Sequence, residues 1–272
     1  LVVALAAALG DVASCARPVA FSGSSRDVGL LSARERDDHL QQHLQDVMRH
    51  QHLDALTRNA DLVTDLPGYG APPTTQYSGF LDASASTPGT RLHYWFAAKE
   101  TTPTGDDAWL EAPTAVWFNG GPGSSSLLGF LQEQGPLLIN AKGGLMENPF
   151  SWTKYVNLLA LESPAGVGWS YCEEMSTGGD CENDDISTAS DATAALLDFF
   201  RKFPELRKNK LYLTGESYAG VYVPTLAQQI VDHNSDAASE DEKIPLVGIA
   251  TGDPCTDNKS QENSMSMLWY GH

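Results

Sequence analysis

Residues 210–220 read KLYLTGESYAG. Its apolar start predicts a short strand, and the residues that follow Gly220 predict a helix. Ser217 therefore lies on a strand-to-helix turn, between the small residues Gly215 and Ala219. A nucleophilic serine needs such a tight turn, because the turn exposes the hydroxyl and aims the next amide at the same space. The pattern predicts that Ser217 is a nucleophile, and the alternative is an ordinary β–α turn with a serine cap.

A second glycine-rich turn, NGGPG at residues 119–123, follows the strand pattern AVWF at residues 115–118. Such a turn can also bind phosphate, but this one has neither the Lys and Ser or Thr of a Walker loop nor the spacing of a dinucleotide site. In acyl-transfer enzymes a glycine amide at this place donates to the oxyanion, opposite the amide that follows the nucleophile. The order of the two turns along the chain favours an acyl-transfer enzyme.

Strand and helix patterns alternate along the chain after residue 66. The strands are predicted at residues 76–81, 91–97, 115–118, 156–161, 210–214 and 246–250, and the helices at residues 187–203 and 221–233. Strands that alternate with helices indicate a largely parallel sheet with helices on both faces.

The sequence has 272 residues, of which 42% are hydrophobic, so it is long enough for one large domain with a sizeable core. Its formal net charge is −18. A chain this acidic repels nucleic acid and anionic membrane surfaces, and we expect neither as a partner. It repels itself less at low pH, which is in keeping with an acidic compartment.

The first nine residues, LVVALAAAL, form an apolar run that small residues follow. We interpret residues 1–16 as the remnant of a secretory signal, because the run is too short to span a bilayer. A buried helix or part of a membrane anchor is the alternative. Residues 17–65 are polar and are expected to form an N-terminal extension or pro-segment. Residues 66–272 then form the main domain.

Four histidines lie in a ragged helical pattern over residues 33–58, and they are His39, His43, His50 and His52. A metal site would need them in a recognised ligand spacing with Cys or carboxylate groups. No such spacing occurs among them. We therefore favour a solvated helix over a metal site, and we expect neither a metal nor a cofactor.

The sequence has four cysteines. Cys172 and Cys181 flank a turn-rich stretch, and we expect a local disulfide between them, with two free thiols as the alternative. We expect Cys15 to leave with the signal or to lie at its edge. Cys255 then has no partner, and we interpret this as a sign of missing downstream sequence. Asn258 starts an Asn-Lys-Ser sequon and is the glycosylation candidate.

Three sequence blocks together resemble the serine carboxypeptidases, the α/β-hydrolase family of cathepsin A, the yeast vacuolar carboxypeptidase and their plant relatives. The blocks are WFNGGPGSSS at residues 117–126, ESPAGVGWSY at residues 162–171 and GESYAG at residues 215–220, supported by QYSGFL at residues 76–81. The likeness runs from about residue 66 to residue 272. It implies an α/β-hydrolase fold with a mostly parallel central sheet, incomplete at the C-terminus.

The resemblance also implies a role for each matching residue. Ser217 would be the nucleophile of a serine-type carboxypeptidase, which releases C-terminal amino acids from peptides or proteins through an acyl-enzyme. The amides of Gly121 and Tyr218 would form the oxyanion hole. The carboxylate of the substrate would be bound by Asn119, Glu133 and Glu216, with support from Trp117 and the Gly120 amide.

Two carboxyl groups, Glu133 and Glu216, would face the substrate carboxylate in this interpretation. Close like charges raise a carboxyl pKa, so we expect both residues to hold protons at mildly acidic pH. A protonated Glu donates a hydrogen bond to a carboxylate, whereas an ionised Glu does not. Activity is therefore expected to be favoured at acidic pH. The alternative for Glu133 is a solvated carboxylate at a helix end.

The chain departs from the family pattern after Ser217. In this fold an Asp and then a His follow the serine, yet the later histidines are His233 and His272. His233 lies about four helical turns beyond the serine and points away from it, and His272 is the last residue. We interpret the chain as truncated, or as one product of proteolytic processing, and inactive without the missing half. Ser124 stands where the family usually has a Cys, so a disulfide that commonly holds this loop is absent.

Two other functions stay open. An acyltransferase can use the same scaffold, as some plant relatives do, and a non-catalytic member can keep the fold. Glu133 and Glu216 favour peptide C-termini, because an ester donor has no carboxylate to bind there. By resemblance we also expect a location in the secretory pathway, in the lysosome or vacuole or outside the cell, and the family allows a homodimer.

Overall fold

The computed structural model describes residues 41–42, 48–49, 54, 56–101, 107–257, 259–260 and 263. The expected signal remnant, most of the expected extension with its four histidines, and also Asn258 and His272 lie outside the described residues. The chain divides into two compact units, Leu1–Met48 and Arg49–His272. The fold that follows is that of the second unit.

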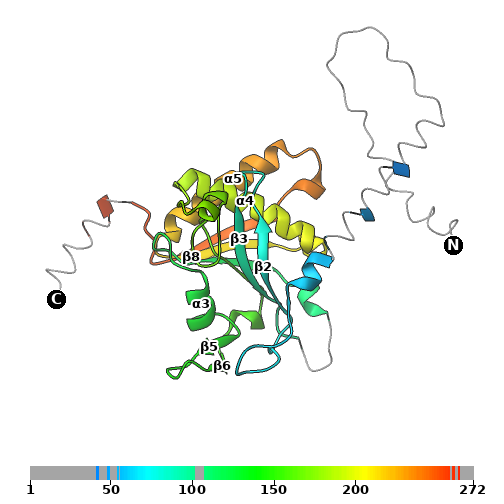
Figure 1. The fold of residues 1–272 in the computed structure, drawn as a ribbon, viewed down its shortest axis with the longest axis vertical. Coiled ribbons are helices and arrows are strands. Elements are labelled where there is room, and N and C mark those ends of the chain that lie inside the picture. The colour runs from blue at the N-terminus through cyan, green and yellow to red at the C-terminus, as the bar shows by residue number, and fades with distance from the viewer. Residues whose placement is uncertain are drawn as a thin grey trace, which may run out of the picture. The chain divides into compact units, whose positions relative to one another are not determined.

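The described strands form one large sheet and one small hairpin (Figure 1). The large sheet has the order β1-β2-β3-β7-β4-β8-β9. Its strands are β1 (Leu62–Val63), β2 (Gln76–Asp82), β3 (Arg91–Ala97), β4 (Thr114–Phe118), β7 (Asn157–Leu161), β8 (Leu211–Glu216) and β9 (Leu246–Gly252). The hairpin consists of β5 (Leu137–Ile139) and β6 (Leu145–Glu147).

The large sheet has an antiparallel part and a parallel part. Strands β1, β2, β3 and β7 pair antiparallel, whereas β7, β4, β8 and β9 run parallel. The predicted α/β architecture is confirmed, with the parallel strands in the second part. Parallel strands end at one edge of a sheet, and ligands bind beyond that edge in open α/β sheets. The residues that follow β4, β7 and β8 therefore meet there.

Two long helices, α4 (Asp185–Lys202) and α5 (Ala219–Asp236), cover one face of the sheet. The short helix α3 (Leu127–Gln132) packs on the other face through Phe130. The 3₁₀ helices are η2 (Ala108–Glu111), η3 (Trp152–Lys154), η4 (Glu173–Thr177), η5 (Pro204–Lys208) and η6 (Glu240–Glu242). Within the described ranges, no helix combines the length and the apolar character that crossing a membrane would require.

Helix α4 begins two residues before the predicted residue 187, at a side-chain cap formed by Asp184. The Asp184 carboxylate accepts a hydrogen bond from the Ser187 amide at 2.7 Å, and the Ser187 hydroxyl accepts one from the Asp184 amide at 2.9 Å. These bonds form a capping box, which satisfies amides that the first turn of a helix leaves unpaired.

Phenylalanine rings fill the space between α4 and the sheet. Phe199 in α4 and Phe203 just after it lie 5.5 and 5.2 Å from Phe96 of β3, measured between ring centroids. All three side chains are fully buried. Burial of one such ring stabilises a fold by about 1.5–3 kcal/mol, so this cluster fixes α4 against the sheet.

The expected local disulfide is present between Cys172 and Cys181. It links the start of η4 to the segment that leads into α4. Cys255 is free within the described part of the chain, and its amide donates to the Ser217 carbonyl at 2.8 Å.

Candidate active site

Ser217 and Tyr218 separate the end of β8 from the start of α5, and Ser217 is exposed. Its φ angle is 56°, a left-handed conformation that costs a non-glycine residue of order 1–2 kcal/mol. The backbone around it is held firmly, because the Ser217 amide donates to the Gly252 carbonyl at 3.0 Å. This is the strained, exposed turn that the GESYAG pattern predicts.

Small residues let this turn pack against the end of β4. A Cβ on Gly215 would lie 2.4 Å from the Phe118 carbonyl oxygen and 2.5 Å from the Cβ of Ala219. A Cβ on Gly120 would lie 2.4 Å from the Tyr218 amide nitrogen and 2.9 Å from the Cβ of Ser217. The two glycine-rich turns of the sequence are therefore in direct contact.

The amides of Gly121 and Tyr218 are both located at this contact. Gly121 has a φ of 113°, which favours glycine. Within the described residues, neither amide has a hydrogen-bond acceptor. Two unpaired amides beside an exposed serine hydroxyl can donate to an oxyanion that forms on the carbon under attack.

Asn119 links the carboxylate-binding candidates to one another. Its Nδ2 donates to Glu216 Oε1 at 2.8 Å, and its Oδ1 accepts from Trp117 Nε1 at 2.8 Å and from the Gly129 amide at 3.0 Å. Asn119 and Trp117 are buried, with 5% and 6% of their surfaces exposed. Glu216 immediately precedes Ser217, so this polar cluster lies beside the candidate nucleophile.

Glu133 joins this cluster from the C-terminal end of α3. Partial burial raises the pKa of Glu133, and the nearby Glu216 carboxylate raises it further. The sequence predicts a raised pKa for Glu133, and it predicts the nearby Glu216 charge as the cause. A carboxyl group with a raised pKa keeps its proton to a higher pH and can then donate a hydrogen bond to an anion.

One residue that fixes the backbone of Glu133, Asn148, is not predictable from the sequence. Buried Asn148 donates from Nδ2 to the carbonyl oxygens of Glu133 at 2.8 Å and Gly135 at 2.9 Å. It follows the short strand β6, which carries no clear periodic pattern in the sequence. A buried amide that satisfies two carbonyls has no local sequence signal, because its partners are distant in the chain.

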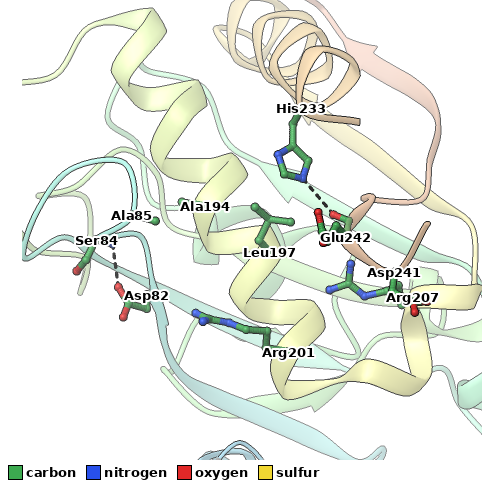
Figure 2. Close-up of a pocket in the computed structure, with 10 residues that line it drawn as sticks. All are labelled: Asp82, Ser84, Ala85, Ala194, Leu197, Arg201, Arg207, His233, Asp241 and Glu242. Carbon is green, nitrogen blue, oxygen red and sulfur yellow. Dashed lines mark hydrogen bonds between the residues drawn. The ribbon is translucent and has the colours of Figure 1, made fainter. Parts of the chain in front are cut away.

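The histidines in the described residues do not serve Ser217. His233 directs its Nε2 to the Glu242 carbonyl at 3.0 Å. Figure 2 shows it among the residues that line a cavity of about 510 Å³ beside α4, and neither Ser217 nor residues 119–123 line that cavity. His93 is buried, with Nδ1 at 2.9 Å from Glu162 and Nε2 at 3.0 Å from the Ser78 hydroxyl. Among the described groups, none is hydrogen-bonded to the Ser217 hydroxyl.

Comparison with known proteins identifies the family. Residues 67–272 match the family model described as serine carboxypeptidase. The chain is 41% identical over 214 residues to the lysosomal protective protein of Mus musculus, a match that covers 78% of this chain and 41% of that protein. It is 42% identical over 206 residues to putative serine carboxypeptidase-like 30 of Arabidopsis thaliana, covering 75% of this chain and 40% of the relative.

A solved structure agrees with these sequence matches. The Kex1 prohormone-processing carboxypeptidase of Saccharomyces cerevisiae superposes with a TM-score of 0.62 at 28% identity, over 72% of this chain and 42% of that one. The chain thus spans about two fifths of the length of the relatives that it matches. Because the family model covers well over half of its residues, the chain belongs to the serine carboxypeptidase family and has the fold of an α/β hydrolase.

Proposed function

We propose that the complete protein is a serine-type carboxypeptidase that releases C-terminal amino acids from peptides. The observation that carries the proposal is the 2.8 Å hydrogen bond from Asn119 to Glu216, the residue before Ser217. This bond sets a group of polar side chains, suited to an anionic chain end, directly beside the candidate nucleophile. A hydrolase that accepts internal peptide bonds has no use for such a cluster at this point.

The proposed chemistry is acyl transfer through Ser217. Its Oγ attacks the last peptide carbonyl, and the amides of Gly121 and Tyr218 stabilise the oxyanion. The C-terminal amino acid leaves with a proton, and water then hydrolyses the ester on Ser217. A general base outside the described residues takes the Ser217 proton and returns it to the leaving amine.

Substrate binding in this proposal depends on protonated carboxyl groups. Glu133, whose pKa is raised, donates a hydrogen bond to the substrate carboxylate at mildly acidic pH. As the pH rises, Glu133 ionises and repels the substrate. The Cys172–Cys181 disulfide and the lysosomal name of the mouse relative support a location in the secretory pathway.

The test uses the complete gene product and an N-acylated dipeptide, supplied with a free C-terminal carboxylate or as the C-terminal amide. Release of the last amino acid is expected from the free acid, with a large preference over the amide, and none from Ser217→Ala. Equal rates on the acid and the amide would contradict the assignment of the carboxylate-binding cluster.

Two rival activities give different results in the same experiment. An acyltransferase would react with a fluorophosphonate probe at Ser217 but would transfer acyl groups from an ester donor and leave the dipeptide intact. A non-catalytic member would not react with the probe. Probe labelling together with the product assay therefore separates the three functions.

A further inference from the structure

Glu162, the residue after β7, carries a buried carboxylate next to the glycine-rich loop. It has no exposed surface. One carboxylate oxygen lies 2.9 Å from His93 Nδ1 and 2.9 Å from the Trp169 amide nitrogen. The other oxygen accepts a hydrogen bond from the Ser125 hydroxyl. Burial of a carboxylate is costly, and hydrogen bonds to partners offset that cost. Here the partners lie on three separate segments of the chain, which the carboxylate holds in one arrangement.

The carboxylate is ionised over most of the pH range. Burial raises the pKa of Glu162, but the hydrogen bonds from His93, Ser125 and the Trp169 amide outweigh it and bring the pKa below its ordinary value. The packing around it is tight as well, because a Cβ on Gly168 would lie 1.9 Å from Glu162 Oε1. Glu162 therefore offers a fixed acceptor, and hydrogen bonds to a charged acceptor are stronger than those between neutral groups.

Ser125 connects this acceptor to the loop that carries Gly121. The hydroxyl of Ser125 also accepts from the Leu127 amide at 3.2 Å. The next residue, Ser126, donates to the Leu161 carbonyl at 2.6 Å and accepts from the Asn119 amide at 3.2 Å. Ser125 and Ser126 thus connect the C-terminal end of the glycine-rich loop to Glu162 and Leu161 at the end of β7.

We propose that Glu162 is a positioning residue, which holds the loop of residues 120–125 against the Ser217 turn by accepting the hydrogen bond from Ser125. This inference rests on the proposed function, since it concerns the oxyanion donors of that reaction. A shift of about 1 Å in an oxyanion donor is enough to slow catalysis strongly.

On the side away from the loop, the hydrogen bonds of Glu162 continue through His93 to β2. There the Ser78 hydroxyl lies 3.0 Å from His93 Nε2. The Ser–His–Glu order resembles a hydrolytic triad, but Ser78 lies within β2, and its amide donates to the Asp61 carbonyl at 2.8 Å. Without a free amide beside it, Ser78 cannot stabilise an oxyanion. Ser78 is therefore a suitable control position, since it touches the network but not the loop.

The test compares Ser125→Ala and Glu162→Gln in the complete protein. Ser125→Ala removes the donor to Glu162. Glu162→Gln removes the charged acceptor and leaves the contact between Ser125 and Leu127. Both variants are expected to lower kcat on the blocked dipeptide roughly 10- to 100-fold, less than the loss of a whole oxyanion donor, with KM changed less than about threefold. Ser125→Thr, which restores the hydroxyl, should return kcat to within about threefold of the parent.

Ser78→Ala is the matched control and should keep kcat within about twofold of the parent. A general loss of stability would lower kcat in Ser78→Ala as well, and that result would overturn the proposal. An unchanged kcat in Ser125→Ala, or a rise in KM with kcat unchanged, would also overturn it. Thermal unfolding of each variant identifies any that fail to fold. If Ser125→Ala does not fold, the kcat of Ser125→Thr tests the proposal in its place.

A second readout separates this inference from the proposed function. The rate of Ser217 labelling by a fluorophosphonate depends on the oxyanion donors but not on a peptide carboxylate. If the parent is labelled but does not cleave the dipeptide, the proposed function fails, and slower labelling of Ser125→Ala still supports the role of Glu162. Equal labelling rates in the parent and Ser125→Ala refute it, as does a parent that is not labelled at Ser217.

Discussion

Gly120 lies so close to the amide nitrogen of Tyr218 that a Cβ on Gly120 would be 2.4 Å from that nitrogen. The two residues are almost a hundred positions apart in the sequence, on the turns that follow β4 and β8. Because these strands are parallel neighbours, the turns leave the sheet side by side. The distance between the proposed oxyanion donors, the amides of Gly121 and Tyr218, is thus set by direct backbone contact.

Replacement of Gly120 by alanine should force the two turns apart. The methyl group would overlap the Tyr218 amide and the Cβ of Ser217, and neither can move without disturbing the Ser217 turn. We expect kcat/KM of the complete protein to fall at least roughly 100-fold, and the free energy of unfolding to fall by about 1–3 kcal/mol. Gly248→Ala in β9, where the new methyl would meet only the Tyr212 ring at 3.3 Å, is the control. Equal losses in both variants would show that the effect is not local.

Glu133→Gln should change how KM depends on pH. Ionisation of Glu133 weakens binding of a carboxylate, so KM of the parent is expected to rise roughly tenfold from about pH 5 to about pH 7. Glutamine donates a hydrogen bond at every pH, and the variant should show a much flatter profile. KM measured against pH on the blocked dipeptide checks this.

The comparison needs a variant with the same change of charge elsewhere. Glu111→Gln serves, because Glu111 is exposed on η2 and pairs with Lys208. It should keep the profile of the parent. A profile for Glu133→Gln that still rises like the parent's would rule out Glu133 as the titrating group.

Removal of the Cys172–Cys181 disulfide should lower the free energy of unfolding by about 2–3 kcal/mol, because the bridge closes a short loop and constrains the unfolded chain. The sequence separation of its cysteines is 9. Denaturant unfolding of the Cys172→Ala, Cys181→Ala double variant measures the loss. Dithiothreitol should reduce the stability of the parent by a similar amount and leave the double variant unchanged. A further loss in the double variant would implicate Cys255 instead.

Protonation of Glu162 should lower the free energy of unfolding at acidic pH. Its folded-state pKa is depressed below 4.5, the ordinary value. Its contribution is therefore complete above about pH 4.5 and is lost as the pH falls through the folded-state pKa. Glu162→Gln should be less stable than the parent by about 2–3 kcal/mol near neutrality, and the difference should shrink below pH 4.5. Urea unfolding at several pH values would reveal this, and a difference that stays constant with pH would contradict it.

Local patterns in the sequence were sufficient to predict the long strands and the two long helices beside the site, but not the short helix α3 that carries Glu133 at its end. The helix predicted at residues 187–203 is α4, which begins at Asp185 because Asp184 caps it. The helix predicted at residues 221–233 is α5, which is longer at both ends and begins directly after the serine turn. These elements are predictable because their periodic apolar residues reflect one buried face.

The parts that could not be predicted depend on distant residues. The hairpin of β5 and β6 has strands of three residues each, too short to carry a periodic pattern. Glu162 stands next to an apolar strand and has no local sign that it is buried. Its burial follows only when His93 and Ser125 converge on it, and that convergence is a property of the strand order.

The position of β7 in the sheet has a consequence for synthesis. β7 lies between β3 and β4, yet residues 157–161 leave the ribosome after both of them. Until then the β2–β3 hairpin and β4 have no strand to join them. A nascent chain paused before residue 157 therefore presents the unpaired edge of β3, with Tyr94 and Phe96, to chaperones and to other chains. The late insertion of this inner strand therefore leaves a sheet edge open until residues 157–161 have been synthesised.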